Sequence, residues 1–294
     1  MSLLGQIYKR LRTQAPRTIN LGGHTVELPT GHRFDWYRLR HSRYDEPLSD
    51  LCHLLVKKYP DLRVIDIGAN VGVTAALMAR TPRVEVLCVE GNEAFLPTLR
   101  RNLARISPTS DIMPCYVGFQ EGEVSGRIVT KAGTASLRID SAAAGPILMR
   151  QLTEILSVHP KFKDSRLLKV DTDGLDAKIV MAASDVIRRM RPVLYIEYSP
   201  HGDREVEQEC RAMIKLLADI GYNHFHVFDN FGNHMVRLSV DELHHLYALN
   251  AYVRASRRDL KPAIFYYDIC AMTADDNDIS DKLLEHYIEE CGLL

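Results

Sequence analysis

The chain has 294 residues, of which 46% are hydrophobic, and its formal net charge at pH 7 is −1. This length and composition suit one large α/β domain, because they provide a sizeable core and exclude a disordered chain. The charge balance gives no overall attraction to nucleic acid, so we do not expect nucleic acid as a partner. We expect neither a transmembrane segment nor a secretion signal. The six cysteines form no C-x-x-C pair, which favours free thiols and a cytoplasmic location.

The charge is unevenly distributed along the chain. Residues 1–60 carry ten Lys and Arg against five acids, whereas residues 275–294 carry seven acids and one Lys. Two solvated faces would explain this, and so would a basic lid over an anionic acceptor or a surface that rests on acidic lipid headgroups. Peripheral contact with a membrane therefore stays open, as does a homodimer.

The first 45 residues are expected to form an N-terminal extension. Apolar residues at helical spacing predict an amphipathic helix over residues 1–12. The alternating segment 18–32, centred on Gly22-Gly23, predicts a hairpin. A helix is then expected from about Glu46 to Tyr59, with Pro60 after its end.

Strand-like and helix-like segments alternate along the rest of the chain. We expect strands at 63–69, 85–91, 113–119, 166–174, 192–198, 224–230 and 263–272, and the segment 232–239 can pair with the strand before it. Helices are expected at 73–80, 94–106, 146–156, 177–190, 205–221 and 241–258, and loops with small strands at 120–145. Such apolar strands separated by helices are typical of a doubly wound parallel sheet covered on both faces. We assign residues 46–274 to this domain and 275–294 to an acidic C-terminal helix.

The first strand of this domain leads into a turn that contains two glycines and an asparagine, Asp66-Ile67-Gly68-Ala69-Asn70-Val71-Gly72-Val73. Ligands of open α/β sheets bind beyond the carboxyl ends of the strands. Gly68 permits close approach of the backbone, and Asn70 is the non-glycine residue that best tolerates positive φ. Gly72 allows the following helix to pack closely on the strand. The turn is therefore a candidate cofactor-binding site.

The identity of the ligand follows from the charge at this turn. A dinucleotide pyrophosphate would be repelled by Asp66, and Asn70 and Val73 interrupt the G-x-G-x-x-G fingerprint. A carboxylate suits the ammonium and sulfonium groups of S-adenosyl-L-methionine. Glu90, at the end of the second strand, is placed to bind ribose hydroxyls in either type of cofactor.

Four segments of the sequence resemble the FkbM-type methyltransferases: VIDIGANVG (64–72), VEGNEAFLPTLRRNL (89–103), LLKVDTDGLDAKIVMAASDVI (167–187) and RPVLYIEYS (191–199). The resemblance extends from about Tyr44 to Tyr198. Family members usually have D-x-E-G where this chain has Asp171-Thr172-Asp173-Gly174. The resemblance implies a Rossmann-like sheet of seven strands with the last antiparallel. It also implies S-adenosylmethionine-dependent O-methylation of a sugar, a glycan precursor or a related small molecule, with S-adenosyl-L-homocysteine as the product.

The resemblance also implies roles for individual residues. Asp66, Gly68, Ala69, Asn70, Gly72, Val73 and Asp171 would surround the methionine portion of the cofactor. Glu90, Gly91 and Asn92 would lie at the ribose, and Gly118, Phe119 and Gln120 at the adenine.

Methyl transfer to oxygen requires a group that accepts the proton of the acceptor hydroxyl. Asp171 and Asp173 follow the strand next to the cofactor turn and are the first candidates, although they could instead cap the next helix. His201 is a second candidate, because its ordinary pKa lies near neutrality. We expect Lys169, Glu197 and Tyr198 to contact the acceptor, and Trp36, Tyr37 and Tyr44 to stack on it. No residue set has metal-ligand spacing.

Two alternatives remain open at this stage. One is a nicotinamide-dependent dehydrogenase or epimerase, although the chain lacks both the glycine pattern and a Tyr-x-x-x-Lys pair. The other is a binding protein without catalytic activity that retains a methyltransferase fold.

Overall fold

The computed structural model describes residues 15–120, 122–131, 134–139, 145–200, 204–259, 264–290 and 292. The helix expected over residues 1–12, together with His201 and Cys291, lies outside the described residues. The other five cysteines are free, as expected. No helix in the described part of the chain is long and apolar enough to cross a membrane.

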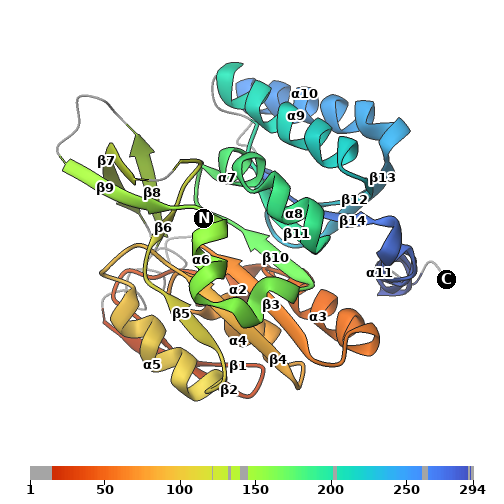
Figure 1. Cartoon of the computed structure of the whole chain (residues 1–294). Coiled ribbons are helices and arrows are strands. Elements are labelled where there is room, and N and C mark those ends of the chain that lie inside the picture. Colours follow the sequence, from red (N-terminus) through yellow and green to blue (C-terminus); the bar gives the residue numbers. More distant parts are fainter. Residues whose placement is uncertain are drawn as a thin grey trace.

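An eight-stranded mixed sheet with helices on both faces forms the centre of the molecule (Figure 1). In spatial order its strands are β13 (His234–Ser239), β12 (Tyr222–Asp229), β14 (Tyr267–Thr273), β11 (Val193–Tyr198), β10 (Leu167–Val170), β3 (Leu62–Ile67), β4 (Val84–Val89) and β5 (Asp111–Met113). Strand β14 lies antiparallel between β11 and β12. The expected doubly wound sheet with an antiparallel last strand is therefore confirmed. Strand β13 adds an eighth strand at the edge, paired with β12 as the sequence allowed.

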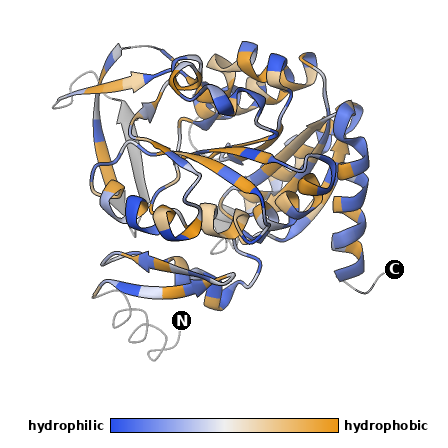
Figure 2. Cartoon of the chain, turned by 60° about the horizontal axis from the view of Figure 1, so that its bottom comes forward, coloured by the Kyte–Doolittle hydropathy of each residue, from blue (hydrophilic) through white to orange (hydrophobic). Residues whose placement is uncertain are grey.

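Alternation along the central strands explains why both faces of the sheet are covered. On β3, Ile65 and Ile67 pack on one face, whereas Leu62 and Val64 pack on the other. One face is covered by α6 (Leu152–Val158), α7 (Asp176–Ala182), α8 (Ser184–Met190), α9 (Arg204–Asp219) and α10 (Leu243–Asp259). The other is covered by α3 (Glu46–Lys58), α4 (Val73–Met78), α5 (Leu96–Ile106) and α11 (Asn277–Glu290). In Figure 2 the ribbon of α11, next to the C-terminus, is largely hydrophilic.

A hairpin of β1 (Arg17–Leu21) and β2 (His24–Leu28) packs outside α4 and α5, which confirms the expected hairpin. Leu28 and Val26 are fully buried in a cluster with Val71 and Phe95. A short helix that the sequence did not predict, α2 (Phe34–Arg40), follows the hairpin. The side chains of Arg17 and Asp35 form a two-pronged ion pair that fixes α2 to the hairpin. The extension from residue 15 to 45 is thus part of the packed structure.

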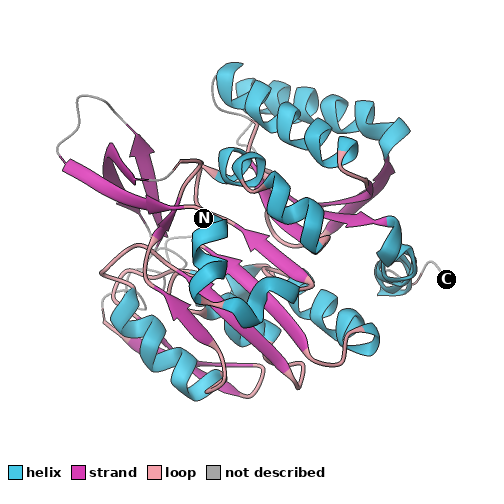
Figure 3. Cartoon of the chain, viewed as in Figure 1, coloured by secondary structure: helices cyan, strands magenta, loops and turns pink. Residues whose placement is uncertain are grey.

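Three local predictions are wrong. The third strand of the main sheet is Asp111–Met113 and not 113–119, because Pro114 cannot continue the ladder. The chain continues into β6 (Tyr116–Val117) of a second sheet with β7 (Gly122–Lys131), β8 (Thr134–Ile139) and β9 (Gly145–Arg150), which projects from the main body (Figure 3). Residues 146–150, expected to be helical, form β9, and α6 begins only at Leu152. The expected helix over 177–190 is divided into α7 and α8 at Ala183.

Candidate active site

A cavity lies at the carboxyl ends of β3, β4, β10 and β11, where an open α/β sheet binds its ligands. It is lined by several of the predicted site residues: Tyr37, Tyr44, Gly68, Ala69, Asn70, Val73, Glu90, Gly91, Lys169, Asp171, Asp173 and Glu197. Residues that the sequence did not single out also line it, among them His32, Phe34, Asp45, Tyr116 and Tyr266. The cavity therefore joins the β3–α4 turn, the N-terminal extension and the start of β14.

The β3–α4 turn has the backbone that its sequence predicts. Gly68, Asn70 and Gly72 have φ angles of 81°, 53° and 85°, in the left-handed region. A Cβ atom at Gly68 would lie 1.8 Å from the carbonyl oxygen of Asp171, so only glycine lets the ends of β3 and β10 approach this closely. Gly72 does not line the cavity but packs on Leu99 as the N-cap of α4.

Glu90 joins two loops at the wall of the cavity. Its Oε2 accepts a hydrogen bond from the amide of Asn70 at 2.8 Å, and its Oε1 accepts one from the amide of Asn92 at 2.7 Å. Each carboxylate oxygen can accept a further bond, so the group fits a ribose diol. Burial raises the pKa of Glu90, although both amides and the Lys169 cation favour the carboxylate. Asn92 itself does not line the cavity, and its side chain accepts a bond from the amide of Ala94.

Asp66 lies beneath the cavity and not in its wall. Its side chain is fully buried, with Oδ2 accepting a hydrogen bond from the Thr74 hydroxyl at 2.6 Å and Oδ1 lying 3.0 Å from Lys169 Nζ. Lys169 also lies 3.3 Å from Asp171 Oδ2, and Lys169 and Asp171 both line the cavity. The negative charge of Asp66 is therefore offset by Lys169, and its influence on a ligand would pass through that lysine.

Asp171 and Glu197 lie level with each other on adjacent parallel strands, since Val170 pairs with Ile196 one residue earlier. Their side chains are hydrogen-bonded. Burial, followed by the negative charges of Asp171 and Asp176, raises the pKa of Glu197 well above its ordinary value. Glu197 therefore favours the protonated form, which donates to Asp171. The Asp171 side chain is 43% exposed, so a ligand in the cavity can reach it.

Neither Asp171 nor Asp173 caps the following helix. The N-cap of α7 is Leu175, without a side-chain cap bond. Asp176 instead orders the loop, because it accepts bonds from the amide of Thr172 at 2.6 Å and from that of Gly174 at 3.1 Å. Asp173 lines the cavity with a left-handed φ of 56°. Both aspartates line the cavity, and neither is the N-cap residue of α7.

Aromatic side chains of the N-terminal extension line another part of the cavity. The rings of Tyr37 and Tyr44 stack with centroids 5.4 Å apart and planes at 16°, and both line the cavity. Tyr44 is hydrogen-bonded to Tyr266, at the start of β14. Trp36 does not line the cavity; its ring contacts Tyr37 and lies under the guanidinium of Arg40.

Asp45 and His32 bring the N-terminal extension into the site. Asp45, which the sequence analysis missed, lines the cavity with a left-handed φ of 60°. Burial and then the charge of Asp171 raise its pKa to about 7. The His32 side chain is hydrogen-bonded to Asn70 of the cofactor turn, and burial lowers its pKa to about 4, so it is neutral.

Four further residues that were assigned to ligand binding lie outside the cavity. Gly118, Phe119 and Gln120 lie beyond the cavity, and Cys115, Tyr116 and Val117 line it in their place. The shift arises because the chain turns at Pro114 out of the main sheet. A Cβ at Gly91 would lie 2.4 Å from the Tyr116 ring, so this ring covers Gly91 next to Glu90. Tyr198 points to the opposite face of β11 from Glu197, where its hydroxyl accepts a bond from Asn250 at 3.0 Å.

Among the described residues, no group of three or more His, Cys, Asp or Glu side chains is arranged to hold a metal ion.

Comparison with solved structures gives distant matches. The chain is 17% identical to the FkbM methyltransferase from Methylobacillus flagellatus, with a TM-score of 0.37 and coverage of 54% of this chain and 37% of that one. It is 12% identical to the O-methyltransferase TomG from Streptomyces achromogenes, solved in complex with SAM, with a TM-score of 0.43 and coverage of 78% and 80%. Fibrillarin from Aeropyrum pernix matches at 13% identity and a TM-score of 0.41, with coverage of 89% and 84%. No curated protein matches the chain.

A family match is more extensive than these structural similarities. The methyltransferase FkbM domain matches residues 66–223, which is more than half of the chain. This range begins at Asp66 and includes the carboxyl ends of the parallel strands β3, β4, β10 and β11, which border the cavity. The chain belongs to the FkbM methyltransferase family.

Proposed function

We propose that the protein transfers a methyl group from S-adenosylmethionine to a hydroxyl of a sugar, a glycan precursor or a related small molecule. The observation that carries this proposal is the meeting of three features in one cavity. These are the cofactor turn with Glu90, the Asp171 carboxylate, and the stacked rings of Tyr37 and Tyr44.

The residues present fit the cofactor by the chemistry of their donors and acceptors. Glu90 offers two carboxylate oxygens to a diol, and Tyr116 offers an aromatic face beside it. Asp171 offers negative charge to a cationic centre, while Lys169 can bind a carboxylate. S-adenosylmethionine supplies an electrophilic methyl group on a positively charged sulfur.

Asp171 is proposed as the base. Asp171 would accept the proton of the acceptor hydroxyl when that oxygen takes the methyl group that S-adenosylmethionine supplies. Lys169 Nζ lies 3.3 Å from Asp171 Oδ2 and places a positive charge beside it, and Glu197 donates a hydrogen bond to the same carboxylate. Tyr37 and Tyr44 would hold the acceptor ring so that its oxygen meets the methyl group in line.

A transfer assay tests the proposal. The purified protein is incubated with S-adenosylmethionine labelled in its methyl group and with sugars, sugar phosphates, glycosides and phenols in turn. The product is identified by a mass increase of one methylene and by NMR assignment of an O-methyl group. Asp219→Asn, an exposed change on α9, is a matched control for Asp171→Asn. Label recovered only on nitrogen or carbon would overturn O-methylation while leaving methyl transfer in place.

A further inference from the structure

Ion pairs join the basic N-terminal segment of the chain to its acidic C-terminal helix. Lys58, the last residue of α3, has its Nζ 2.6 Å from Asp278 Oδ1 and 3.1 Å from Asp276 Oδ1 at the start of α11. Arg43, just before α3, has its Nη1 3.1 Å from Glu290 Oε1 at the end of α11. The acidic C-terminal helix is therefore paired at both of its ends with the basic N-terminal segment.

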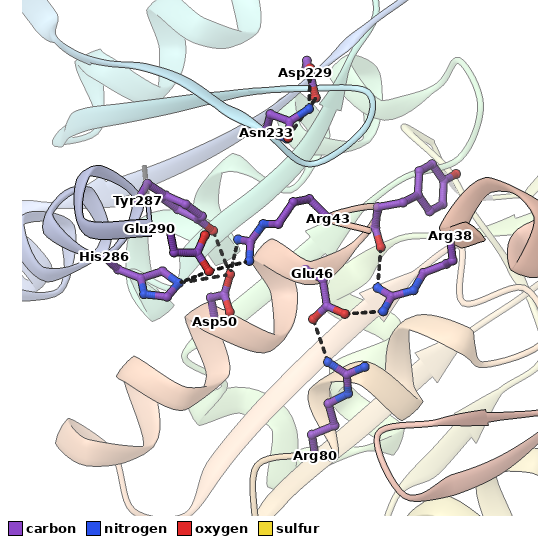
Figure 4. Close-up of polar contacts among 11 residues, drawn as sticks. Arg38, Arg43, Glu46, Asp50, Arg80, Asp229, Asn233, His286, Tyr287 and Glu290 are labelled. Carbon is purple, nitrogen blue, oxygen red and sulfur yellow. Dashed lines mark hydrogen bonds and ion pairs between the residues drawn. The ribbon is translucent and has the colours of Figure 1, made fainter. Parts of the chain in front are cut away.

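Arg43 is the centre of the second group of contacts (Figure 4). Its Nη2 donates to Asp50 Oδ2 at 2.6 Å, and its guanidinium lies 5.1 Å from the centroid of the Tyr287 ring. The Tyr287 hydroxyl donates to the same Asp50 oxygen at 3.0 Å. Asp50 and Glu290 therefore bind different nitrogens of the planar guanidinium, and the Tyr287 ring lies against its face. The ammonium group of a lysine could not make all three contacts.

The backbone of Arg43 is held from another direction by the β12–β13 turn. A Cβ at Gly232 would lie 2.0 Å from the carbonyl oxygen of Arg43, and the His41 ring stacks on Phe231 at 3.8 Å. Asp229 fixes this turn by accepting bonds from the amides of Phe231 and Asn233, each at 2.9 Å.

The residues that follow Arg43 are Tyr44 and Asp45, which line the cavity. A second ion cluster holds their other side: Glu46 pairs with both Arg38 and Arg80, and Arg38 donates to the carbonyl of Tyr44 at 2.9 Å. Asp45 has a left-handed φ of 60°, a conformation that is uncommon for a non-glycine residue. The acceptor wall, Tyr44 and Asp45, is thus fixed between two ion clusters.

We propose that Arg43 is a positioning residue for the methyl acceptor: by tying the acceptor wall to α11, it sets the shape of the acceptor end of the cavity. The inference rests on the proposed function for the identity of the acceptor end. The link from α11 to the wall rests on the contacts alone. Arg43 does not line the cavity, so its effect on an acceptor passes through Tyr44 and Asp45.

The chain contains a reporter of the wall. Trp36 is its single tryptophan, and its ring contacts Tyr37, which stacks on Tyr44. Trp36 fluorescence and the hydrogen exchange of amides 41–46 can both be followed without an acceptor. Suitable variants of the full chain are Arg43→Gln, which removes the charge, and Arg43→Lys, which keeps it. Arg83→Gln is the matched control, since Arg83 forms an exposed ion pair with Asp61, away from the wall.

Arg43→Gln should raise exchange at 41–46 by about tenfold and alter Trp36 emission, because local opening of the wall becomes easier. Arg43→Lys should restore little, and Arg83→Gln should match the unchanged protein. Affinity for S-adenosylhomocysteine should stay within about twofold, because Glu90 and the cofactor turn are untouched. With an acceptor from the transfer assay, KM for the acceptor should rise about tenfold and kcat should change less.

Exchange at 41–46 and Trp36 emission that match those of the unchanged protein would overturn the proposal. The proposal would also be overturned if Arg43→Gln lowered the affinity for S-adenosylhomocysteine by as large a factor as it raised hydrogen exchange at 41–46. Should Arg43→Gln fail to fold, Glu290→Gln applies the same test, since Glu290 is 42% exposed at the end of α11. If the proposed function is wrong, the protein without substitutions will not bind S-adenosylhomocysteine. The hydrogen-exchange measurement does not depend on that binding, so the two failures can be distinguished.

Discussion

Lys169 Nζ lies 3.0 Å from Asp66 Oδ1, and both side chains are almost completely buried, with exposures of 3% and 0%. Removing the cation alone leaves a buried carboxylate without compensation. We expect Lys169→Met to lower the free energy of unfolding by about 3–5 kcal/mol. Unfolding in urea measures this, and the double variant Lys169→Met/Asp66→Asn should recover much of the loss. A double variant as unstable as the single one would show that packing and not charge dominates at this pair.

Two substitutions after β10, Asp171→Asn and Asp176→Asn, should distinguish a loss of turnover from a loss of stability. Asp171→Asn should lower kcat by roughly two to four orders of magnitude if this carboxylate accepts the proton. The melting temperature should change little, because α7 takes no cap bond from Asp171. Asp176→Asn should do the reverse, since Asp176 orders the 172–174 loop. Steady-state kinetics with thermal unfolding of the two variants makes the comparison, and Asp171→Asn with normal turnover would move the base to Asp173 or His201.

The stability of the protein should depend on pH through Asp45. Its pKa is about 7 in the folded protein, raised chiefly by burial and then by the charge of Asp171. In the unfolded chain an aspartate has a pKa of about 3.9. The folded state therefore binds this proton more tightly, so the contribution of Asp45 to stability is full below about pH 4 and is lost as the pH rises through 7.

Asp45→Asn removes that dependence and keeps a residue that tolerates positive φ. We expect the variant to melt at a higher temperature than the unchanged protein at pH 8, with the difference shrinking toward pH 5. Thermal scans at pH 5, 6, 7 and 8 provide the measurement. A constant difference across this range would mean that Asp45 is already ionised in the folded protein at pH 5.

The hairpin should be required for the fold as well as for the site. Leu28 is fully buried with Val71, the residue after Asn70 of the cofactor turn. Leu28→Ala should cost about 2–5 kcal/mol of unfolding free energy and also weaken S-adenosylhomocysteine binding. Deleting the first 45 residues would expose this cluster, so it cannot test a lid alone. Thr25→Ala, an exposed change in the same strand, is the control; equal stability of the two variants would contradict this account.

The main sheet could be predicted because its strands carry a strong and local pattern. The segment 64–67 is apolar apart from Asp66, and a left-handed turn follows it at Gly68 and Asn70. Glycine, asparagine and buried apolar runs act within a few residues, so their effect can be inferred without tertiary contacts. The third strand was misplaced because the apolar run 115–117 continues past Pro114 into another sheet.

The missed site residues depend on contacts between distant segments. Asp45 and His32 reach the cavity only because the extension packs over α4 and α5, and nothing in their local sequence indicates it. Tyr266 could have been found. Since the last strand is antiparallel, its start and not its end lies at the edge where the parallel strands end. Tyr198 was misassigned because side chains alternate, and Glu197 already occupies the face toward the cavity.

Calorimetry with cofactors tests the central claim most directly. The unchanged protein and Glu90→Gln are titrated with S-adenosylhomocysteine and, separately, with NAD. We expect saturable binding of S-adenosylhomocysteine, weakened about tenfold or more in Glu90→Gln, because hydrogen bonds to a charged group are worth about 1.5–3 kcal/mol. NAD should give no binding heat. Binding of NAD without binding of S-adenosylhomocysteine would contradict the assignment of this cavity to methyl transfer.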